Sequence, residues 1–208
     1  SEERFRHLFG RAPIALAISD SDGRVILVNQ AFETLFGYRQ EELPSVETFR
    51  QRVYPDPAER AQQEQYWRDS WNDAVDETRR QTPVEVAAVS KDGSAKTILV
   101  SRQRLGDDML VAIIDITARK EAEEKVRELS QAIEQSPEAI VITDLNGNIE
   151  YVNEAFVENT GFSREETLGR NASLLSSGDT ELETYKAMWE ALGRGEVWKG
   201  EFHNRRKN

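Results

Sequence analysis

The chain of 208 residues contains no cysteine and only two histidines. Without cysteine it has no disulfide bonds, no thiolate metal site and no cysteine nucleophile. No apolar run approaches the roughly 20 residues that a membrane span requires. The N-terminus, Ser1-Glu2-Glu3-Arg4, also lacks the pattern of a signal peptide. We therefore expect a cytoplasmic protein with no membrane segment in this chain.

Basic residues are also in deficit. The chain has 27 Lys and Arg against 38 Asp and Glu, which gives a formal net charge of −11. A nucleic-acid-binding face needs clustered Lys and Arg to neutralise phosphates, so no nucleic-acid partner is expected. The sequence shows no Ser/His/Asp set, no metal-ligating cluster and no phosphate-cradling glycine loop. We therefore predict no catalytic and no metal-binding residues, and a regulatory rather than enzymatic fragment.

What the sequence does contain is an internal repeat. Residues 13–42 align without a gap with residues 137–166 at a constant offset of 124, and 12 of these 30 positions are identical. Each copy has an apolar strand, an Asp-Gly or Asn-Gly dipeptide typical of a type I′ hairpin turn, and a second strand. A short helical segment follows and ends at Gly37 or Gly161. The chain is therefore built from two copies of one unit.

The first copy continues into a helix and then an antiparallel meander. Its helix carries Trp67, Trp71, Ala74 and Thr78 at helical spacing. The meander is predicted from the strand patterns of residues 84–89, 97–104 and 109–116. The second copy reaches Asn208 about where the first turn of this meander would fall, so we expect it to lack the last two strands.

A charged, helix-prone segment, residues 117–135, joins the copies. Its apolar residues Ala122, Val126, Leu129 and Ile133 step by four, three and four, which gives about two heptads. This pattern fits either the seam of a dimer or a solvated connector helix, since two heptads alone are marginal.

The order of these motifs resembles that of PAS sensory domains from bacterial signal-transduction proteins. The resemblance rests on the hairpin, the Val-Asn-x-Ala-Phe string, the Glu-Glu pair, the long helix and the meander ending in Asp115-Ile116-Thr117. It implies an α+β fold, in which a five-stranded antiparallel sheet flanked by short helices forms a small-molecule pocket. The expected domains are residues 1–117 with an N-terminal helix, a helical linker at 118–135, and an incomplete second PAS domain at 136–208.

The resemblance also indicates which cofactors the chain could bind. Light-sensing flavin domains of this family use a Gly-Arg-Asn-Cys motif, and here Ala172 stands where the thiol would be. A cysteinyl-flavin adduct is therefore excluded. Haem-binding relatives supply an axial histidine, commonly from the long helix. Neither His7 nor His203 lies in that helix, so haem is not expected.

A redox flavin fits the second copy better. Residues 169–178, 185–189 and 198–207 are similar to the FAD-binding PAS domains of redox regulators of nitrogen fixation. This similarity implies FAD contacts by Trp189 and Asn204, with Asn171 of the Gly-Arg-Asn motif as a third candidate. Two positions, Val141 and Ala172, lack polar groups that those relatives carry. Trp189 also lies on an apolar helical stripe, so a core role, another ligand or no ligand are alternatives.

In the first copy, Arg102 and Arg104 could pair with an anionic ligand or be ordinary exposed strand arginines. Tyr54, Tyr66, Trp67 and Trp71 could line a pocket, or form core and interface.

The predicted function is a sensory module that passes a small-molecule or redox state through the linker helix. Its output would lie outside this sequence, in a histidine kinase of a two-component system or a diguanylate cyclase or phosphodiesterase. We expect a homodimer through the linker and N-terminal helices. The alternative is a ligand-free PAS module that only dimerises or scaffolds.

Overall fold

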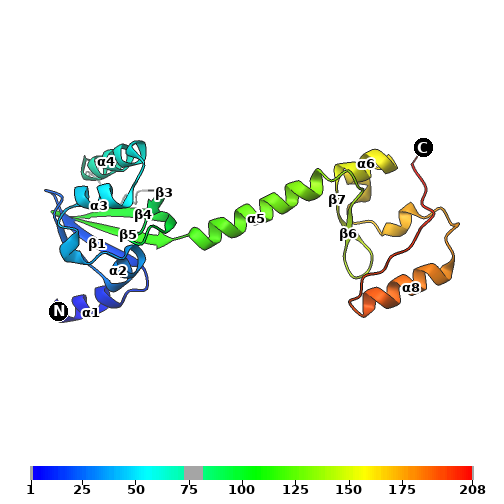
Figure 1. Cartoon of the computed structure of the whole chain (residues 1–208), viewed down its shortest axis with the longest axis horizontal. Helices are drawn as coiled ribbons and strands as arrows, with labels where there is room; N and C mark the ends of the chain where they lie inside the picture. The colour runs from blue at the N-terminus through cyan, green and yellow to red at the C-terminus, as the bar shows by residue number, and fades with distance from the viewer. Residues whose placement is uncertain (1, 73–81, 208) are drawn as a thin grey trace. The chain divides into compact units, whose positions relative to one another are not determined.

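The computed structural model describes residues 2–72 and 82–207. It separates into two units, Ser1–Glu123 and Glu124–Asn208. Helix α5 (Thr117–Glu134) crosses this boundary (Figure 1). None of the helices in the part of the chain that the structure describes is both long and apolar enough to cross a bilayer.

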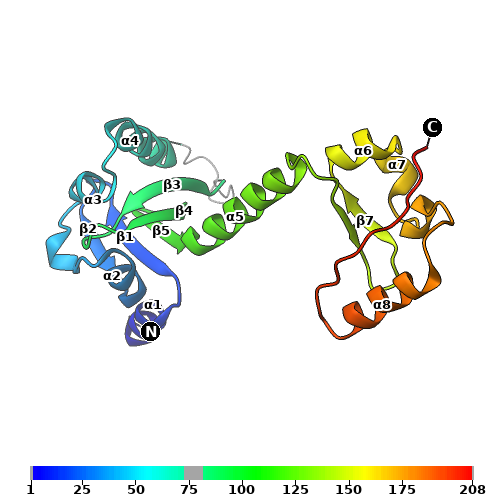
Figure 2. The ribbon, with the colours of Figure 1, turned by 45° about the vertical axis from the view of Figure 1, so that its right-hand side comes forward.

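The first unit contains the predicted five-stranded antiparallel sheet. Its strand order is β2-β1-β5-β4-β3, so the N-terminal hairpin pairs with the last strand of the meander (Figure 2). The strands are β1 (Ala15–Asp20), β2 (Val25–Val28), β3 (Val84–Val89), β4 (Ala95–Leu105) and β5 (Asp108–Asp115). The fold class is therefore α+β, as expected, and the three meander strands lie where the sequence predicted them.

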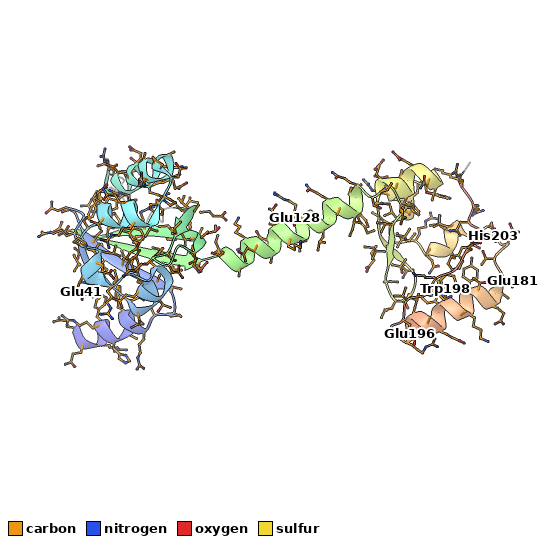
Figure 3. The ribbon with its side chains drawn as sticks, viewed as in Figure 1. Glu41, Glu128, Glu181, Glu196, Trp198 and His203 are labelled. Atoms are coloured by element: carbon orange, nitrogen blue, oxygen red, sulfur yellow. The ribbon has the colours of Figure 1, made fainter. Side chains whose placement is uncertain are left out.

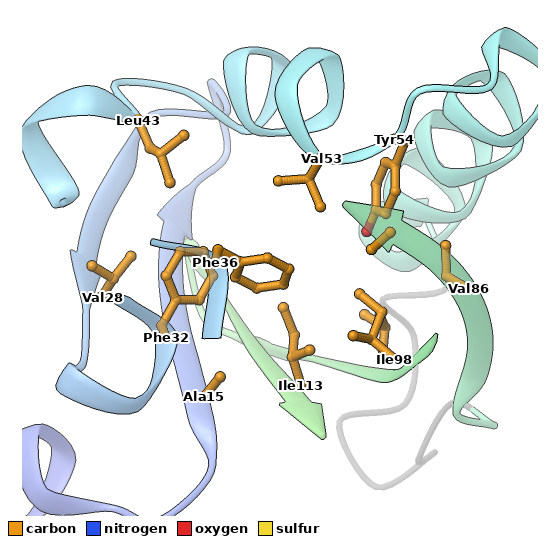
Figure 4. Packing of buried hydrophobic residues seen from close by; sticks show 12 residues of the cluster. Ala15, Val28, Phe32, Phe36, Leu43, Val53, Tyr54, Val86, Ile98 and Ile113 are labelled. Atoms are coloured by element: carbon orange, nitrogen blue, oxygen red, sulfur yellow. The ribbon is translucent and has the colours of Figure 1, made fainter. Parts of the chain in front are cut away.

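Helices pack on the sheet of the first unit. They are α2 (Gln30–Phe36), a 3-10 turn (Gln40–Glu42), α3 (Val46–Val53) and α4 (Pro57–Asn72), whereas α1 (Glu2–Arg11) packs on α2. Phe36, Leu43 and Tyr54 of this layer meet Ile98 and Ile113 of the sheet in one buried core (Figure 4). Burying each such side chain contributes about 1.5–3 kcal/mol, which fixes the helical layer over the inner face. Of the predicted tryptophan stripe, Ala74 and Thr78 lie outside the described residues.

The second unit repeats the first part of this architecture. Strands β6 (Val141–Thr143) and β7 (Ile149–Val152) form a two-stranded antiparallel sheet. The helical elements are α6 (Glu154–Thr160), α7 (Arg164–Thr167), a 3-10 turn (Ala172–Leu175) and α8 (Leu182–Gly193). The hairpins of the two units share the same register shift, between Ile18 and Ser19 and between Ile142 and Thr143. The sequence repeat is therefore a structural repeat.

The hairpin turns differ from the predicted type I′. Among the described residues, only glycines have positive φ, with values of 79° at Gly23 and 78° at Gly147. A type I′ turn needs positive φ at both central residues. Instead, Gly23 donates to the carbonyl oxygen of Asp20, and the Asp20 carboxylate accepts the backbone N–H groups of Asp22 and Arg24. Such aspartate-capped turns place a single left-handed glycine at the end of the loop.

Candidate functional site

A cavity of about 60 Å³ lies in the first unit, between the inner face of the sheet and helices α3 and α4. Most of its lining is apolar, including Val28, Phe49 and Val111. A small set of polar or amphipathic side chains also reaches it: Ser19, Arg50, Tyr54, Gln63, Trp67 and Arg102. A largely apolar pocket with few convergent polar groups is the usual form of a small-molecule site.

Strand alternation places Arg102 in the cavity. Ile98 and Val100 are buried on the inner face of β4, and Arg102 follows them at the same spacing of two. Its Nη2 atom donates to Oε1 of the buried Gln63 at 2.7 Å. Arg102 is therefore an inward-facing arginine. Arg104 also lies on this face, but its Nη1 atom donates to the carbonyl oxygen of Trp71 at 3.2 Å.

Arg50 enters the same cavity from α3. Ser45 begins this helix by accepting the N–H of Thr48, and Arg50 follows on its buried side with only 8% of its surface exposed. The Nη2 atom of Arg50 lies 2.9 Å from Oε2 of Glu47, and its guanidinium lies over the ring of Trp67, 5.9 Å from the centroid. Its Nη1 atom is buried without a hydrogen-bond partner among residues 2–72 and 82–207. This second arginine is a cavity residue that the sequence analysis missed.

The cavity is electropositive. Burial lowers the pKa of Arg102, and the positive charge of Arg50 lowers it further. The phenol of Tyr54 is fully buried, and this desolvation raises its pKa to about 12. Tyr54 is therefore neutral at ordinary pH and contributes no negative charge. Among the described residues, the one carboxylate that pairs with either cavity arginine is that of Glu47.

In the second unit, Asn171 and Trp189 meet at the hairpin glycine. A Cβ atom on Gly147 would lie 3.2 Å from Nδ2 of Asn171 and 3.4 Å from Cη2 of Trp189. Nδ2 of Asn171 donates to the carbonyl oxygen of Asn146, and its side-chain oxygen accepts the N–H of Ser173. The structure therefore brings two of the three candidate cofactor residues together, around a turn that Asn171 stabilises.

Asn204, the third candidate, lies beside Ser176, with which it forms an isolated β-bridge. Its side chain is exposed and makes no hydrogen bond to the other two candidates in the described part of the chain. The N–H of Lys207 donates to the carbonyl oxygen of Thr160, and the N–H of Lys91 donates to that of Phe36, the residue equivalent to Thr160 in the first unit. Lys207 therefore corresponds to Lys91. Three residues earlier, Asn204 corresponds to the buried Ala88 of β3. By that correspondence, Asn204 belongs to a sheet position that faces the core.

His203 is exposed and lies on the stretch after α8, outside the long helix, as expected (Figure 3). Its carbonyl oxygen accepts the N–H of Ser177 at 3.2 Å. Within residues 2–72 and 82–207, no group of three or more His, Asp or Glu side chains is arranged to hold a metal ion.

Each unit also contains an asparagine that joins it to the preceding helix. Nδ2 of Asn153 donates to the carbonyl oxygens of Ile133, Ser136 and Glu138, and its Oδ1 accepts the N–H groups of Ile140 and Phe156. Asn29 makes the equivalent five contacts in the first unit, 124 residues earlier, including one to Phe9 at the end of α1. Both asparagines belong to the Val-Asn-x-Ala-Phe string of the repeat and are identical in the two copies.

The sequences of both units match PAS family models. Residues 3–72 match the model described as PAS domain, and residues 127–207 match the model described as PAS fold. With the five-stranded sheet of the first unit and the repeated hairpin of the second, these matches show that the chain belongs to the PAS family and carries two PAS domains in tandem.

Curated relatives are signalling and regulatory proteins. A nitrogen fixation regulatory protein of Klebsiella oxytoca is 40% identical over 76 residues, which cover 36% of this chain and 15% of that protein. The biofilm dispersion protein BdlA of Pseudomonas aeruginosa is 25% identical over 199 residues, 91% of this chain and 45% of that protein. The chain thus spans less than half the length of each of these relatives. Together they support a sensory role in signalling.

A solved structure with a similar fold is the PAS domain of an HTR-like protein from Haloarcula marismortui. It has a TM-score of 0.43 and 24% sequence identity, and the similarity covers 55% of this chain and 96% of that one. PAS sensory domains are regulatory rather than catalytic.

Proposed function

We propose that this chain is a sensory relay. The first PAS domain binds a small molecule in its cavity, and helix α5 carries the resulting change to the second PAS domain. The observation that carries this proposal is that each end of α5 is fastened to a sheet by side-chain hydrogen bonds. One end belongs to the first unit and the other to the second.

The first turn of α5 is attached to the sheet whose inner face forms the cavity floor. Oγ1 of Thr117 accepts the N–H of Thr97, at the start of β4, at 2.9 Å. The carboxylate of Asp115 accepts the N–H of Thr117 at 2.9 Å, and Lys120 pairs with Glu85 of β3 at 2.6 Å. Strand β4 also carries Arg102. A shift of β4 on ligand binding would therefore act directly on the start of α5.

The last turn of α5 is attached to the second unit. The buried Asn153 binds the carbonyl oxygen of Ile133, and Glu134 contacts both the hydroxyl of Tyr151 and the guanidinium of Arg164. Tyr151 belongs to β7 and Arg164 to α7. A change in the direction or stability of α5 would therefore act on this hairpin.

Amide hydrogen exchange on a Thr117→Val variant tests the relay without knowledge of the ligand. The substitution removes the acceptor for the N–H of Thr97. We expect faster exchange at the start of α5 and also at the N–H groups of Ile140 and Phe156, which donate to Asn153. An Arg119→Ala variant, which alters an exposed side chain two residues later, is the control. A Thr117→Val effect that stops within α5 would refute the relay.

We also propose that the chain forms a homodimer through α5 and α1. Val126 and Leu129 of α5 are 67% and 53% exposed, and Phe5 and Leu8 of α1 are exposed as well. Large apolar side chains at heptad spacing on one helix face favour pairing with a second copy.

For the second domain we propose a flavin such as FAD as the first ligand to test. Trp189 packs on the hairpin glycine as Trp67 does in the first unit, where Trp67 lines the cavity. Trp189 is 46% exposed, and the carboxamide of Asn204 is exposed and makes no hydrogen bond to a described residue, so an indole and a carboxamide are available to an isoalloxazine ring. The carboxamide of Asn171 is used within the turn and fits a positioning role. A bound flavin would supply a redox-responsive chromophore.

The flavin proposal has a direct test. The parent protein, purified without added cofactor, should show the visible absorption band of oxidised flavin, and Trp189→Ala should reduce the bound fraction. A colourless protein with no flavin released on denaturation would contradict it. The proposed output, a histidine kinase or a cyclic-di-GMP enzyme, lies outside this sequence, and the proposed location is cytoplasmic. The rival function is a ligand-free interaction module.

A further inference from the structure

One of the two arginines that line the cavity of the first domain has no carboxylate within ion-pair distance among the described residues. Arg50 shares the carboxylate of Glu47, whereas Arg102 contacts only the neutral carboxamide of Gln63 among the described residues. A further carboxylate, that of Glu59, accepts from Nε2 of Gln63 at 3.2 Å, so it reaches Arg102 only through this carboxamide. The guanidinium of Arg102 therefore has no direct counter-ion among the described residues. Buried charges in proteins are nearly always paired, because removing an ion from water without a counter-ion is strongly unfavourable.

Unused hydrogen-bond donors surround this charge. Nη1 of Arg50, Oγ of Ser19 and Nε1 of Trp67 are buried without a partner in the structure, and all three residues line the cavity. Ser19 comes from β1, Arg50 from α3 and Trp67 from α4, so three separate elements bring these donors to the lining of one cavity. Buried donors without partners are rare in native proteins, and three of them on residues that line one cavity point to a ligand that accepts them.

The register of the sheet gives the width of the site. Ala17 of β1 and Arg102 of β4 both lie opposite Val111 of the intervening β5. With strands about 4.8 Å apart, their Cα atoms are separated by about 10 Å. An arginine side chain spans much of that distance, so the guanidinium of Arg102 extends under α4, where Gln63 holds it.

The volume and the lining of the cavity indicate the chemical class of its ligand. At about 10–15 Å³ for each water-sized group, a cavity of about 60 Å³ accommodates about four to six non-hydrogen atoms. The guanidinium of Arg102, which lacks a direct counter-ion, favours a ligand with one negative charge, and a guanidinium matches a carboxylate through two parallel hydrogen bonds. The apolar lining suits a short hydrocarbon body, whereas inorganic phosphate would leave oxygen atoms against Val28, Phe49 and Val111.

From these features we infer that the first PAS domain binds a short-chain monocarboxylate, with its carboxylate between Arg102 and Arg50 and its hydrocarbon chain against the apolar lining. The inference deepens the proposed sensory function and rests on it. Ser19 would donate to the carboxylate or to a neighbouring hydroxyl group. Nothing reacts: the ligand is bound and released.

Isothermal titration calorimetry on the whole chain, at constant ionic strength, tests the inference. The probes are acetate, propionate, butyrate, hexanoate, inorganic phosphate and butyramide, the uncharged analogue of butyrate. We expect saturable binding of propionate and butyrate, weaker binding of hexanoate because it exceeds the cavity, and no binding of butyramide. Absence of saturable binding of every carboxylate, or equal binding of butyrate and butyramide, would overturn it. Tighter binding of phosphate than of butyrate would replace the ligand class by an inorganic anion.

Two variants locate the site. Arg102→Met should weaken butyrate binding by about tenfold or more, because a charge-assisted pair is lost. Arg104→Met, two residues along the same strand, should bind butyrate as the unmodified chain does, because Arg104 is engaged by Trp71. Arg102→Met should also melt at the same or a higher temperature without ligand, since it removes a partly buried charge that has no direct counter-ion. Equal butyrate affinities for the two variants would refute the assignment.

Failure of this inference and failure of the relay give different results. If carboxylates do not bind but Thr117→Val still alters exchange at Ile140 and Phe156, the ligand class is wrong and the relay stands. If butyrate binds at Arg102 but Thr117→Val changes nothing beyond α5, the ligand stands and the relay fails.

Discussion

Removing the side chain of Asn153 should detach helix α5 from the second PAS domain. This residue is fully buried, and its carboxamide makes five hydrogen bonds, the shortest of them 2.8 Å to Glu138 O and 2.8 Å from Ile140 N. In Asn153→Ala the N-cap of α6 is lost, which costs about 1 kcal/mol. Two well-formed bonds to buried backbone groups are lost as well, at about 1–1.5 kcal/mol each. The free energy of opening of the second unit should therefore fall by about 3–4 kcal/mol.

Hydrogen exchange followed by mass spectrometry is the suitable assay, because it reports the two units separately where a global melt need not be two-state. Asn153→Ala should accelerate exchange in β6, β7 and α6 and leave β1 and β2 unchanged. Asn29→Ala is the matched variant and should do the reverse, since Asn29 holds the same position in the first unit. A fall of less than about 1 kcal/mol in the free energy of opening of the second unit would refute the reasoning, because the lost hydrogen bonds alone should contribute more than that. Equal effects on both units would refute it as well.

Asn153→Asp separates shape from hydrogen bonding. The carboxylate keeps the acceptor for Ile140 and Phe156 but turns an oxygen toward the carbonyl groups of Ile133, Ser136 and Glu138. Those oxygens favour the protonated form, so the pKa of this aspartate is raised in the folded state. The stability of the variant should thus be highest below the unfolded-state pKa and fall as pH rises through the folded-state value. A variant no less stable at pH 7 than at pH 4 would contradict this assignment.

Three further predictions concern other parts of the chain. Val126→Glu combined with Leu129→Glu should convert the proposed homodimer to a monomer in sedimentation equilibrium, and an unchanged mass would exclude this dimer face. Gly147→Ala should destabilise the second unit by about 1–2 kcal/mol, because a left-handed residue gains a Cβ; unchanged exchange there would contradict it. The pKa of Glu134 is lowered, chiefly by a hydrogen bond from the Tyr151 hydroxyl. The ionised carboxylate of Glu134 therefore stabilises the fold above the ordinary glutamate pKa, and this stabilisation is lost as pH falls through the lowered value. Glu134→Gln should thus flatten the acid limb of a curve of unfolding free energy against pH.

Most of the scaffold could be predicted from the sequence because its signals are local. Alternating apolar residues, turn dipeptides and a repeat offset of 124 are all readable within short windows. The predicted type I′ hairpin turn was wrong for a physical reason. Asp-Gly suits a type I′ turn, but Asp20 stands two residues earlier, and its carboxylate accepts the N–H groups of Asp22 and Arg24 and so favours a longer loop with one left-handed glycine.

The cavity was harder to foresee because its polar groups come from separate elements. Arg102 could have been placed, since Ile98, Val100 and Arg102 share one face of a strand whose apolar members must face the core. Arg50 could not, because its burial depends on α4 crossing over α3 so that Trp67 covers the guanidinium. A charged residue in a short helix is most often exposed, and only the tertiary packing shows otherwise.

The two copies differ in the residues that the same backbone framework carries after the hairpin. Backbone bonds pair Pro44 with Val25 and Arg170 with Ile149 in the same way, so after the hairpin the two copies align at an offset of 126 (170 − 44). Asn171 then takes the place of the cap Ser45, which accounts for its role in the turn.

At the same offset the second copy has Ser176 where the first has Arg50, and the hydroxyl of Ser176 lies 3.2 Å from that of Tyr185. A neutral hydroxyl cannot balance an anion as a guanidinium does. If Arg50 and Arg102 define the carboxylate site, the second domain should take an uncharged or ring-shaped group against Trp189 instead. The identity of each ligand would then depend on a few substitutions over a shared hairpin, and the tandem pair would combine two different inputs through one helix.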